Sequence, residues 1–479
     1  MSKQLSRRSF LGASLAVAGS AALPRFAQAQ QPTARTLFAE RRVIDVLGKP
    51  ANVFGIRAQD GRQGLFLPAS ERFLVDLENQ IGTETIIHWH GQVPDPAQDG
   101  VADTGYVSPL AAGETRSFDF PARSGTHWMH SHHGLQEQSL LAAPLVVYTA
   151  EDEAADLQDE TVLLHDFSFR SPEEILAELT GGDIGGHGMH GSDNTAMGGG
   201  MMMGGMDHGM MSMDLNDVAY DAFLANDRTL DDPQVIRTEP NGSVRLRLIN
   251  GATSSAFWIN LGDAQATVLA VDGNDVEPIT GSRFPMASAQ RLDLLIDMSG
   301  KSVVPVLAQV EGLTDRTGVI LAVNGAEVPK ISRRAEQAEG PVDLSLEERL
   351  ISRHPLASRA ADRTIQTMIM GSMAPYAWNL DNAPWPNRRP LTVAEGERVT
   401  LEIMNHSMMA HPMHLHGHHF QVTSLNGRPL DGAVRDTVLV PPMATVGISF
   451  DADNPGRWLF HCHNLYHMAT GMMTEVIYG

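Results

Sequence analysis

The sequence predicts an all-β protein made of three consecutive β-sandwich domains. Short runs rich in β-branched residues alternate with turns rich in Gly, Pro, Asp and Asn, and long helical patterns are few. One strand-like pattern occurs three times, as ERFLVDLENQIG from Glu71, GSVRLRLINGAT from Gly242 and GERVTLEIMNHS from Gly396. A chain of 479 residues is too long for one ordinary core, so several domains are expected.

The three copies share both their alternation and their spacing. In the second copy, Val244, Leu246 and Leu248 face one way and Arg245 and Arg247 the other, which predicts a strand with one buried face. Each copy ends in an aliphatic residue, one further residue and an asparagine, at Asn79, Asn250 and Asn405. Nine residues beyond each asparagine the sequence reads HWHG from His88, INLG from Ile259 and HLHG from His414. The equal offset indicates an internal repeat.

The repeat sets the predicted domain boundaries. The domains span residues 33–150, 151–325 and 361–479, and a charged connector at 326–360 leads into the third. The second domain keeps the glycine of the repeated motif but has Ile259 and Leu261 where the other two have histidine. We therefore expect it to act as a spacer without a metal site of its own.

The first 29 residues have the features of an export signal. The arginine pair Arg7 and Arg8 lies in SRRSFLG, an apolar run follows at 11–23, and AQA ends at Ala29. This pattern predicts a twin-arginine signal peptide over residues 1–29, and its apolar run is too short to span a bilayer. We expect the twin-arginine (Tat) machinery to deliver the folded protein to a periplasm, and no other segment looks transmembrane.

Charge and cysteine content narrow the function classes. The formal charge of −22 becomes −26 without the signal segment, which carries four basic residues and no acid. Such acidity argues against nucleic acid as a partner and suits small cationic substrates, although it also serves solubility. Cys462 is the only cysteine, so an internal disulfide is impossible. It is a buried apolar residue, a reactive thiol or a metal ligand.

Histidines occur in pairs separated by one residue. GTHWMHSH and GRWLFHCH align with His130 over His461 and His132 over His463, which places Ser131 opposite Cys462. Together with the repeated motif this gives four pairs, His88 and His90, His130 and His132, His414 and His416, His461 and His463. A lone histidine is more often structural than a ligand, but four pairs in register across two domains indicate metal binding.

Strand geometry separates two metal sites. Residues i and i+2 of a strand share a face, so each pair offers two imidazoles on one side and Cys462 points to the other. His411 is at an odd separation from His414, and His467 and Met472 follow Cys462 closely. Two imidazoles, a thiolate and a weak thioether are the ligands of a blue-copper electron-transfer site. Zinc is the alternative, but it has no redox chemistry and gives no reason to link two sites.

These motifs, HWHG, HWMHSH, HPMHLHG and HCHNLYHMATGMM, resemble those of the three-domain multicopper oxidases, the family of laccases and bacterial cuprous oxidases. The resemblance implies three cupredoxin-like, Greek-key β-sandwich domains and four copper ions per chain. It implies a type 1 copper held by His411, Cys462 and His467, with Met472 as the axial ligand. It implies a type 2 copper on His88 and His414, and two type 3 coppers, one on His90, His130 and His463 and the other on His132, His416 and His461.

The family mechanism implied by the resemblance passes single electrons from the type 1 copper through Cys462, His461 and His463 to the three-copper cluster. There dioxygen takes up four electrons and becomes water. Asp99, nine residues after His90, matches the family's proton-supplying acid by position. The alternative for Asp99 is an ordinary Asp-Gly turn.

A glycine-rich insert at residues 187–213 holds nine of the 24 methionines. So many glycines preclude a packed element, and soft thioethers select Cu(I), which favours a copper-collecting loop over a merely tolerated insertion. The insert resembles the methionine-rich segments of periplasmic cuprous oxidases. The possible ligands for substrate Cu(I) are Met189, Met197, Met201, Met202, Met203, Met206, Met210, Met211, Met213 and Met409.

Two departures from the known cuprous oxidases keep the reductant open. Their acidic partners for Cu(I) would align with Ser407 and Ala469, neither of which is acidic. Their insert lies in the third domain near the type 1 site, whereas the insert here lies in the second domain. We favour a cuprous oxidase that serves copper tolerance. The alternatives are a laccase-like oxidase of phenols and aromatic amines, and a non-enzymatic copper-storage protein. The oligomeric state is open, with a monomer expected.

Overall fold

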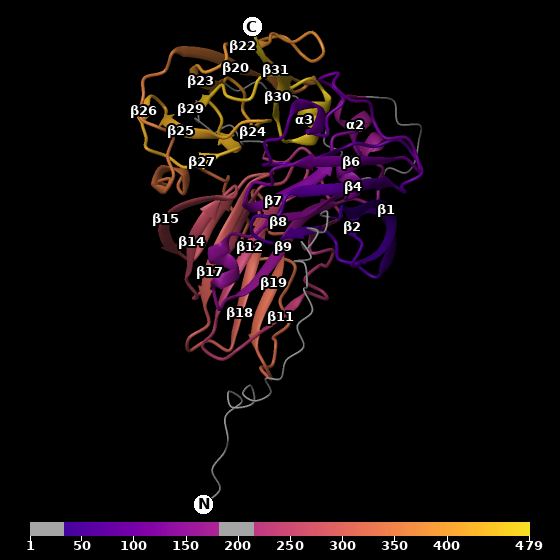
Figure 1. The fold of residues 1–479 in the computed structure, drawn as a ribbon. Helices are drawn as coiled ribbons and strands as arrows, with labels where there is room; N and C mark the ends of the chain where they lie inside the picture. Colours follow the sequence, from indigo (N-terminus) through magenta and orange to yellow (C-terminus); the bar gives the residue numbers. More distant parts are fainter. Residues whose placement is uncertain (1–32, 182–214) are drawn as a thin grey trace, which may run out of the picture. The chain divides into compact units, whose positions relative to one another are not determined.

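The computed structural model describes residues 33–181 and 215–479. The expected signal peptide and all nine methionines of the insert lie outside the described residues. Residues 34–479 form one compact unit. In its described part, six β-sheets fall into three successive pairs, which are three cupredoxin-like β-sandwiches (Figure 1). None of the described helices is long and apolar enough to cross a membrane.

The first sandwich packs a sheet of strand order β2-β1-β4-β6 against one of order β3-β8-β7-β5. The first sheet contains β1 (Arg35–Val46), β2 (Lys49–Ala58), β4 (Phe73–Asn79) and β6 (Thr115–Phe120). The second contains β3 (Leu65–Leu67), β5 (Ile87–His88), β7 (Gly125–Ser131) and β8 (Ala142–Val147). Two 3₁₀ turns, η1 (Pro96–Gln98) and η2 (Gln136–Ser139), connect strands of this sandwich.

The second sandwich has sheets of order β10-β9-β12-β17-β14-β15 and β11-β19-β18-β13-β16. The strands of the first are β9 (Gln158–Phe167), β10 (Ala222–Ala225), β12 (Ser243–Asn250), β14 (Ala266–Val271), β15 (Asn274–Gly281) and β17 (Arg291–Asp297). Those of the second are β11 (Val235–Thr238), β13 (Phe257–Asn260), β16 (Arg283–Met286), β18 (Val303–Val310) and β19 (Arg316–Val323). Helices α1 (Ala150–Ala154) and α2 (Pro172–Leu179) flank β9, and η3 (Glu347–Arg349) follows β19.

The third sandwich has a sheet of order β21-β20-β23-β29-β25-β26, with β27 paired to β25, and a sheet of order β22-β31-β30-β24-β28. The strands of the first are β20 (Arg363–Met373), β21 (Tyr376–Leu380), β23 (Arg398–Asn405), β25 (Phe420–Leu425), β26 (Arg428–Pro429), β27 (Val434–Arg435) and β29 (Thr445–Asp451). Those of the second are β22 (Leu391–Val393), β24 (His411–Leu415), β28 (Thr437–Val440), β30 (Arg457–Cys462) and β31 (Met473–Tyr478). Helix α3 (Leu465–Ala469) follows β30.

The three repeated segments form equivalent strands. β4, β12 and β23 each pair in parallel with the long strand that opens their sandwich, namely β1, β9 and β20. The asparagine that ends each strand donates a side-chain hydrogen bond to a backbone carbonyl in the loop that follows, from Asn79 to Thr83 (2.7 Å), from Asn250 to Ser255 (3.0 Å) and from Asn405 to Met409 (2.7 Å). The repeated asparagine therefore fastens the loop that leads to the next strand.

The expected exposed face of the second copy is wrong for β12. Val244, Leu246 and Leu248 lie in the core as predicted, but Arg247 on the opposite face is also fully buried. Its guanidinium donates to Asp159 Oδ2 (2.7 Å) and to Thr126 Oγ1 of the first sandwich (3.0 Å). The arginine face is buried because it meets another sandwich, and ion pairing satisfies the guanidinium there.

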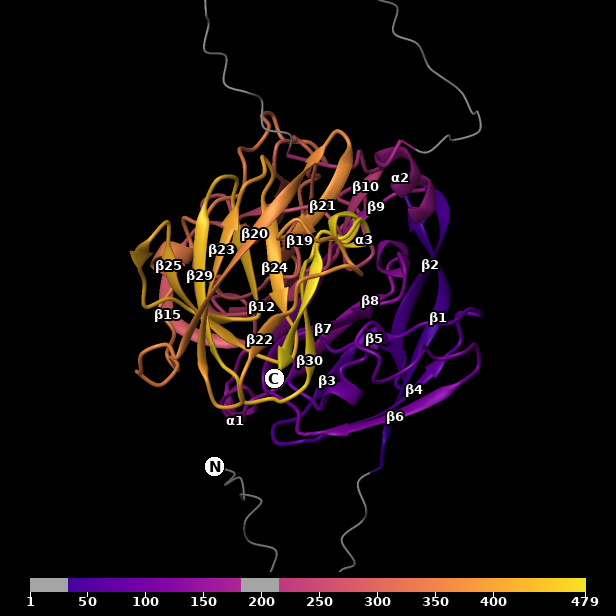
Figure 2. The same cartoon turned by 90° about the horizontal axis from the view of Figure 1, so that it is seen from above.

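Four strands bring the histidine pairs to one place, and each strand contains the first histidine of its pair while the second lies just beyond its end. In the first sandwich β5 pairs with β7, and His88 lies opposite His130. In the third sandwich β24 pairs with β30, and His414 lies opposite His461. Figure 2 shows β24 and β30, in yellow and orange, beside the purple β5 and β7.

Candidate metal centre

Eight buried histidines from the first and third sandwiches form one cluster. Their ligand atoms approach within 4.8 Å of one another in three groups, which are His88, His90 and His414; His90, His130 and His463; and His132, His416 and His461. The most exposed of them, His132, is only 7% exposed. Among the described residues, none of the second sandwich belongs to such a group. Each group therefore combines ligands from two sandwiches.

Hydrogen bonds determine which nitrogen of each ring faces the cluster. The Nδ1 of His88 bonds the Asp99 carbonyl (2.9 Å), and the Nδ1 of His414 bonds the Asp436 carbonyl (2.8 Å). A carbonyl only accepts, so each Nδ1 carries the proton and each Nε2 keeps a free lone pair. The Nε2 atoms of His88, His130, His132, His414 and His463 are buried without a hydrogen-bond partner. Buried polar atoms are rarely left unpaired, and a metal ion would bind them.

The contact between His416 and His461 gives the clearest indication of a cation-binding site. His416 Nδ1 donates to the Asp99 carboxylate (2.8 Å), and His461 Nδ1 donates to the Cys462 carbonyl (2.9 Å). Their Nε2 atoms face each other at 3.0 Å, and both carry lone pairs. Burial lowers the pKa of both rings well below 6.5, so neither gains a proton there at neutral pH. Neutral imidazoles with converging lone pairs fit a metal site.

His90 is inverted relative to its neighbours. Its Nε2 bonds Asp436 Oδ1 (3.0 Å), and its unpartnered buried atom is Nδ1. Its ring is stacked on that of His414, with 3.7 Å between ring centroids.

A second group consists of His411, Cys462 and His467 in the third sandwich. Cys462 Sγ is 3.7 Å from His411 Nδ1 and 3.6 Å from His467 Nδ1, and the two nitrogens are 3.0 Å apart. All three side chains are fully buried. Met472 is also buried, and its carbonyl accepts a bond from the Cys462 amide (3.1 Å). The trio offers two nitrogens and one sulfur to one ion, with Met472 adjacent.

The surroundings of the trio keep its ligands dry and oriented. Ser407 Oγ bonds His411 Nε2 (2.7 Å), and the Trp378 ring lies 4.2 Å from the His467 ring between centroids. Burial raises the pKa of the Cys462 thiol, although the Asn464 amide donates to its sulfur (3.4 Å). A thiolate there requires a bound cation, since burial alone disfavours the charge.

Asp217 is a site residue that sequence reasoning missed. Its carboxylate lies 3.1 Å from His467 Nε2 and accepts a bond from Asn464 Nδ2 (2.5 Å), and its side chain is fully buried. Asp217 belongs to the second sandwich region and lies just after the methionine-rich insert. On the other side of the insert, Ile175 of α2 packs in the core of the third sandwich.

The insert belongs to the second domain in the sequence, and the described segments on either side of it pack against the third sandwich. Both segments contact the third sandwich, and one reaches a predicted type 1 ligand. Asp217 thus places a carboxylate beside the trio, where Ser407 and Ala469 supply none. No spacing in the sequence indicates this, because 250 positions separate Asp217 from His467.

Asp99 points into the cluster. It caps η1 and is 2% exposed, and its two carboxylate oxygens lie 2.8 Å from His416 Nδ1 and 3.3 Å from His88 Nδ1. The next residue, Gly100, has φ +78, and a Cβ there would lie 1.7 Å from the Ile87 carbonyl oxygen. The Asp-Gly turn exists, and it serves to direct the carboxylate inward.

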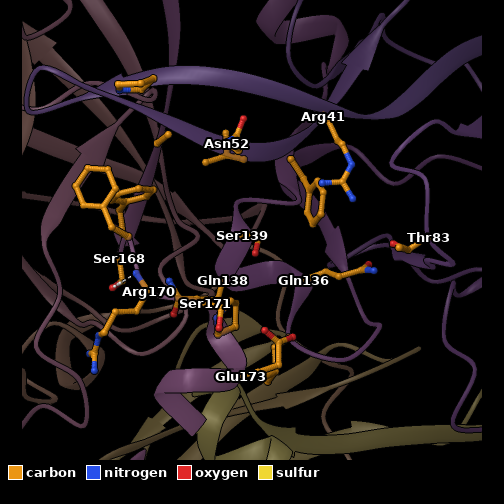
Figure 3. Close-up of a pocket in the computed structure, with 18 residues that line it drawn as sticks. Arg41, Asn52, Thr83, Gln136, Gln138, Ser139, Ser168, Arg170, Ser171 and Glu173 are labelled. Carbon is orange, nitrogen blue, oxygen red and sulfur yellow. Dashed lines mark hydrogen bonds between the residues drawn. The ribbon is translucent and has the colours of Figure 1, made fainter. Parts of the chain in front are cut away.

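Glu137 is a second missed residue. Its carboxylate lies 2.8 Å from His130 Nδ1 and 3.9 Å from His463 Nδ1, so it contacts histidines of both sandwiches. Burial, assisted by Asp166, raises the pKa of Glu137 well above its usual value. Gln136 and Gln138, on either side of it, line a hollow of about 630 Å³ between β2, η2 and α2 (Figure 3). None of the predicted copper ligands lines this hollow.

Met409 is the only predicted Cu(I) ligand within the described residues. It is 5% exposed and packs in the core of the third sandwich, whereas its neighbour Met408 is 50% exposed. Met409 also lines a small cavity with Leu215, Glu311 and Asn464.

Comparisons with known proteins agree with this architecture. Models of the multicopper oxidase family match residues 50–152, 161–308 and 359–479. The chain is 31% identical over 413 residues to "Multicopper oxidase MmcO" of Mycobacterium tuberculosis, which covers 85% of this chain and 79% of that protein. It is 25% identical over 521 residues to "Copper resistance protein A" of Escherichia coli, covering 84% and 85%, and 24% identical over 510 residues to "Laccase-1" of Fomitopsis schrenkii, covering 91% and 87%.

Solved structures show the same fold. The structure of Fet3p, "a Multicopper Oxidase that Functions in Iron Import", has a TM-score of 0.73 at 17% identity and covers 92% of this chain and 90% of that one. A laccase from Botrytis aclada has a TM-score of 0.73 at 20% identity, with coverage of 93% and 87%.

Proposed function

Because this chain belongs to the multicopper oxidases and is thus a copper-dependent oxidoreductase, we propose that it couples one-electron oxidation of Cu(I) to four-electron reduction of dioxygen to water. Copper bound at the two histidine sites would supply the redox chemistry that no side chain provides. We assign four ions to the chain. One is held by His411, Cys462, His467 and Met472, and three by the eight clustered histidines.

The observation that carries the proposal is the position of Cys462. Its neighbours His461 and His463 belong to the cluster, while its own sulfur belongs to the trio with His411 and His467. A path of a few covalent bonds, on the order of 10 Å including side chains, thus joins the two sites. Storage of copper has no use for such a link, so the arrangement favours an oxidase over a storage protein.

Asp99 is the residue we propose to hold and deliver protons at the cluster. It contacts two rings, His416 and His88, from different sandwiches. Asp99→Asn keeps the size of the side chain and removes its acid function. We expect oxygen reduction to slow by about 10²- to 10⁴-fold with unchanged copper content, which is measured by oxygen uptake and by metal analysis of the same sample. A variant that turns over at the wild-type rate would exclude the role.

Cu(I) is the favoured reductant for three reasons. Asp217 places a carboxylate on His467, the ring of the trio nearest the insert flank. The methionine-rich insert precedes Asp217 in the chain, and thioethers bind Cu(I) well. Relatives of this chain carry the name copper resistance protein A. We therefore propose a role in copper tolerance, after export to the periplasm by the twin-arginine route.

The second candidate is a laccase-like oxidase of phenols and aromatic amines, which the similarity to named laccases favours. Oxygen uptake by the copper-loaded protein distinguishes the two. Cu(I), held by a weak chelator, is compared with a simple phenol, and free Cu(II) is varied in both series. Efficient Cu(I) turnover with weak or copper-dependent phenol oxidation supports the cuprous oxidase. Strong phenol oxidation without added copper supports the laccase.

A further inference from the structure

Within residues 33–181 and 215–479, the second sandwich contributes no ligand to the cluster, yet one of its arginines bonds a carboxylate that contacts two cluster histidines. Arg291, the first residue of β17, is fully buried. Its Nη1 donates to Asp436 Oδ1 (2.7 Å) and its Nη2 to Asp436 Oδ2 (2.5 Å), so both oxygens of the carboxylate are held. Asp436 lies between β27 and β28 of the third sandwich and is 1% exposed. A bidentate pair of this kind fixes direction as well as charge.

Asp436 in turn accepts hydrogen bonds from two cluster histidines. Its Oδ1 accepts from His90 Nε2 (3.0 Å), and its backbone carbonyl accepts from His414 Nδ1 (2.8 Å). The guanidinium of Arg291 donates to both oxygens of this carboxylate, so Asp436 accepts from His90 and the proton of His90 lies on Nε2. The lone pair of His90 is thereby directed through Nδ1, the opposite choice from its neighbours.

Arg291 is itself held from three sides. Its backbone amide donates to Asp272 Oδ1 (2.8 Å), its Nε to the Thr126 carbonyl of the first sandwich (3.1 Å), and its Nη1 to the Ala289 carbonyl (3.1 Å). Asp272 in turn accepts from Arg435 Nε (2.8 Å). The guanidinium is therefore fixed relative to all three sandwiches.

The local backbone is shaped around this pair. Gly91, the glycine of HWHG, has φ +91, and a Cβ there would lie 2.3 Å from His127 Nδ1, 2.8 Å from Arg291 Nη2 and 3.2 Å from Asp436 Oδ2. Only glycine leaves room for the arginine directly behind His90.

We propose that Arg291 is a positioning residue for the copper cluster. Through both oxygens of Asp436 it fixes the inverted ring of His90 and the stacked His90 and His414 pair. The second sandwich thus orients two of the cluster ligands, in addition to separating the first and third domains in the sequence. This inference rests on the proposed assignment of the clustered histidines to copper.

The test is Arg291→Lys in the copper-loaded full-length chain. Lysine keeps the charge but cannot hold both carboxylate oxygens in one plane. We expect the affinity for cluster copper to fall about 10- to 100-fold and the electron paramagnetic resonance signal of the type 2 copper to change, while the blue absorption of the type 1 site is retained. Copper content, the resonance spectrum and visible absorption are measured on each sample.

Arg247→Lys is the matched control. Arg247 is as buried as Arg291, lies in the same sandwich and pairs with Asp159 and Asp293. Among the described residues it has no hydrogen bond to a clustered histidine. The control should lose stability and keep the wild-type cluster signals. Wild-type cluster signals and copper content in Arg291→Lys would overturn the proposal.

Asp436→Asn tests the same proposal if the Arg291→Lys variant does not fold. The amide leaves one oxygen for Arg291 and His90 to share, so we expect the same changed cluster signal with the blue absorption kept. An unchanged signal in this variant also overturns the proposal. Wild-type protein that binds copper but shows no type 2 or type 3 signal would overturn the cluster assignment itself, which separates the two failures.

Discussion

At the scale of single residues, Asp217 connects the second sandwich to the candidate type 1 site. Asp217→Asn retains the shape and removes the negative charge beside His467. A charge-assisted hydrogen bond contributes about 1.5–3 kcal/mol, so we expect the KM for Cu(I) to rise about ten- to a hundredfold while the blue absorption remains. Steady-state oxygen uptake at varied Cu(I) concentration measures this KM.

The control for that substitution is Asp221→Asn, four residues along the same segment. Asp221 is exposed and bonds Ser168 and the Phe169 amide, not the trio. It should leave the KM for Cu(I) at the wild-type value. Equal KM values in the Asp217 variant and the wild type would remove Asp217 from the reductant site.

Glu311 makes stability depend on pH. Burial, against the Val342 amide that donates to its carboxylate (2.8 Å), raises the pKa of Glu311 from 4.5 to about 7. Between these values the native state holds a proton that the unfolded chain has released, so stability falls as the pH rises from about 4.5 to about 7. Above that window the loss reaches about 3 kcal/mol.

Glu311→Gln keeps the acceptor for Val342 and removes the titration. We expect the variant to melt at nearly the same temperature as the wild type near pH 4.5 and at a higher temperature near pH 8, as followed by scanning calorimetry. Glu395→Gln, at an exposed position, controls for the loss of one negative charge. A variant whose advantage is the same at both pH values would contradict the buried titration.

At the scale of elements, the sequence predicts on which side of a strand a ligand lies, but it does not predict which strand faces are buried between sandwiches. The i and i+2 spacing places His461 and His463 on one side of β30 and Cys462 on the other, because strand geometry is local. The same logic assigned Arg247 of β12 to solvent, and it lies buried against the first sandwich. Contacts between sandwiches produce no periodic pattern in the sequence. Alternation of apolar and polar residues therefore cannot tell whether the polar face of a strand is exposed to solvent or buried against another sandwich.

The two elements that flank the insert define the next prediction. The α2 helix begins at a capping box of Ser171 and Glu174, and Ile175 packs in the third sandwich, while Asp217 reaches His467 on the other side. We expect deletion of residues 187–213 to raise the KM for Cu(I) more than the KM for a phenol, because the thioethers that bind Cu(I) are lost. Oxygen uptake with both reductants measures the two values.

A variant with the nine insert methionines replaced by leucine serves as the control for length. If the sulfur atoms bind Cu(I), this variant should raise the KM for Cu(I) as much as the deletion does. If only the presence of the loop is needed, its KM for Cu(I) should equal that of the wild type. Equal increases for Cu(I) and phenol in the deletion variant would refute the collector role.

At the scale of the whole molecule, the candidate site depends on residues that only folding brings together. The four histidine pairs were predicted from a repeat, whereas Asp217, Glu137 and Arg291 were not. Each of these three is a single acid or arginine without a motif. Asp217 and Arg291 contact His467 and Asp436 far away in the chain, and Glu137 contacts the distant His463 as well as the nearby His130. The second domain was expected to be only a spacer because it lacks the paired histidines. Its proposed role in positioning the cluster depends instead on charged side chains such as Arg291.

The sharing of the cluster between two sandwiches predicts how copper affects stability. Five histidines carry unpartnered Nε2 atoms in buried space, and they belong to β5, β7 and β24 or lie next to β7 and β30. An ion bound between sandwiches stabilises the folded state by about 4 kcal/mol at a thousandfold excess over its Kd. Removal of copper should therefore lower the Tm and loosen the interface between the first and third sandwiches.

Calorimetry and hydrogen exchange of the copper-loaded and chelator-treated chain measure both effects. Backbone amides of β7 and β30 should exchange faster without copper, because the crossing ligands no longer join their sandwiches. Amides of β12 and β18, in the core of the second sandwich, should be nearly unchanged and provide the internal reference. Re-addition of copper should restore both the Tm and the protection. Exchange that rises equally in β12 and β30 would mean that copper stabilises the chain as a whole and does not act as a link between two of its sandwiches.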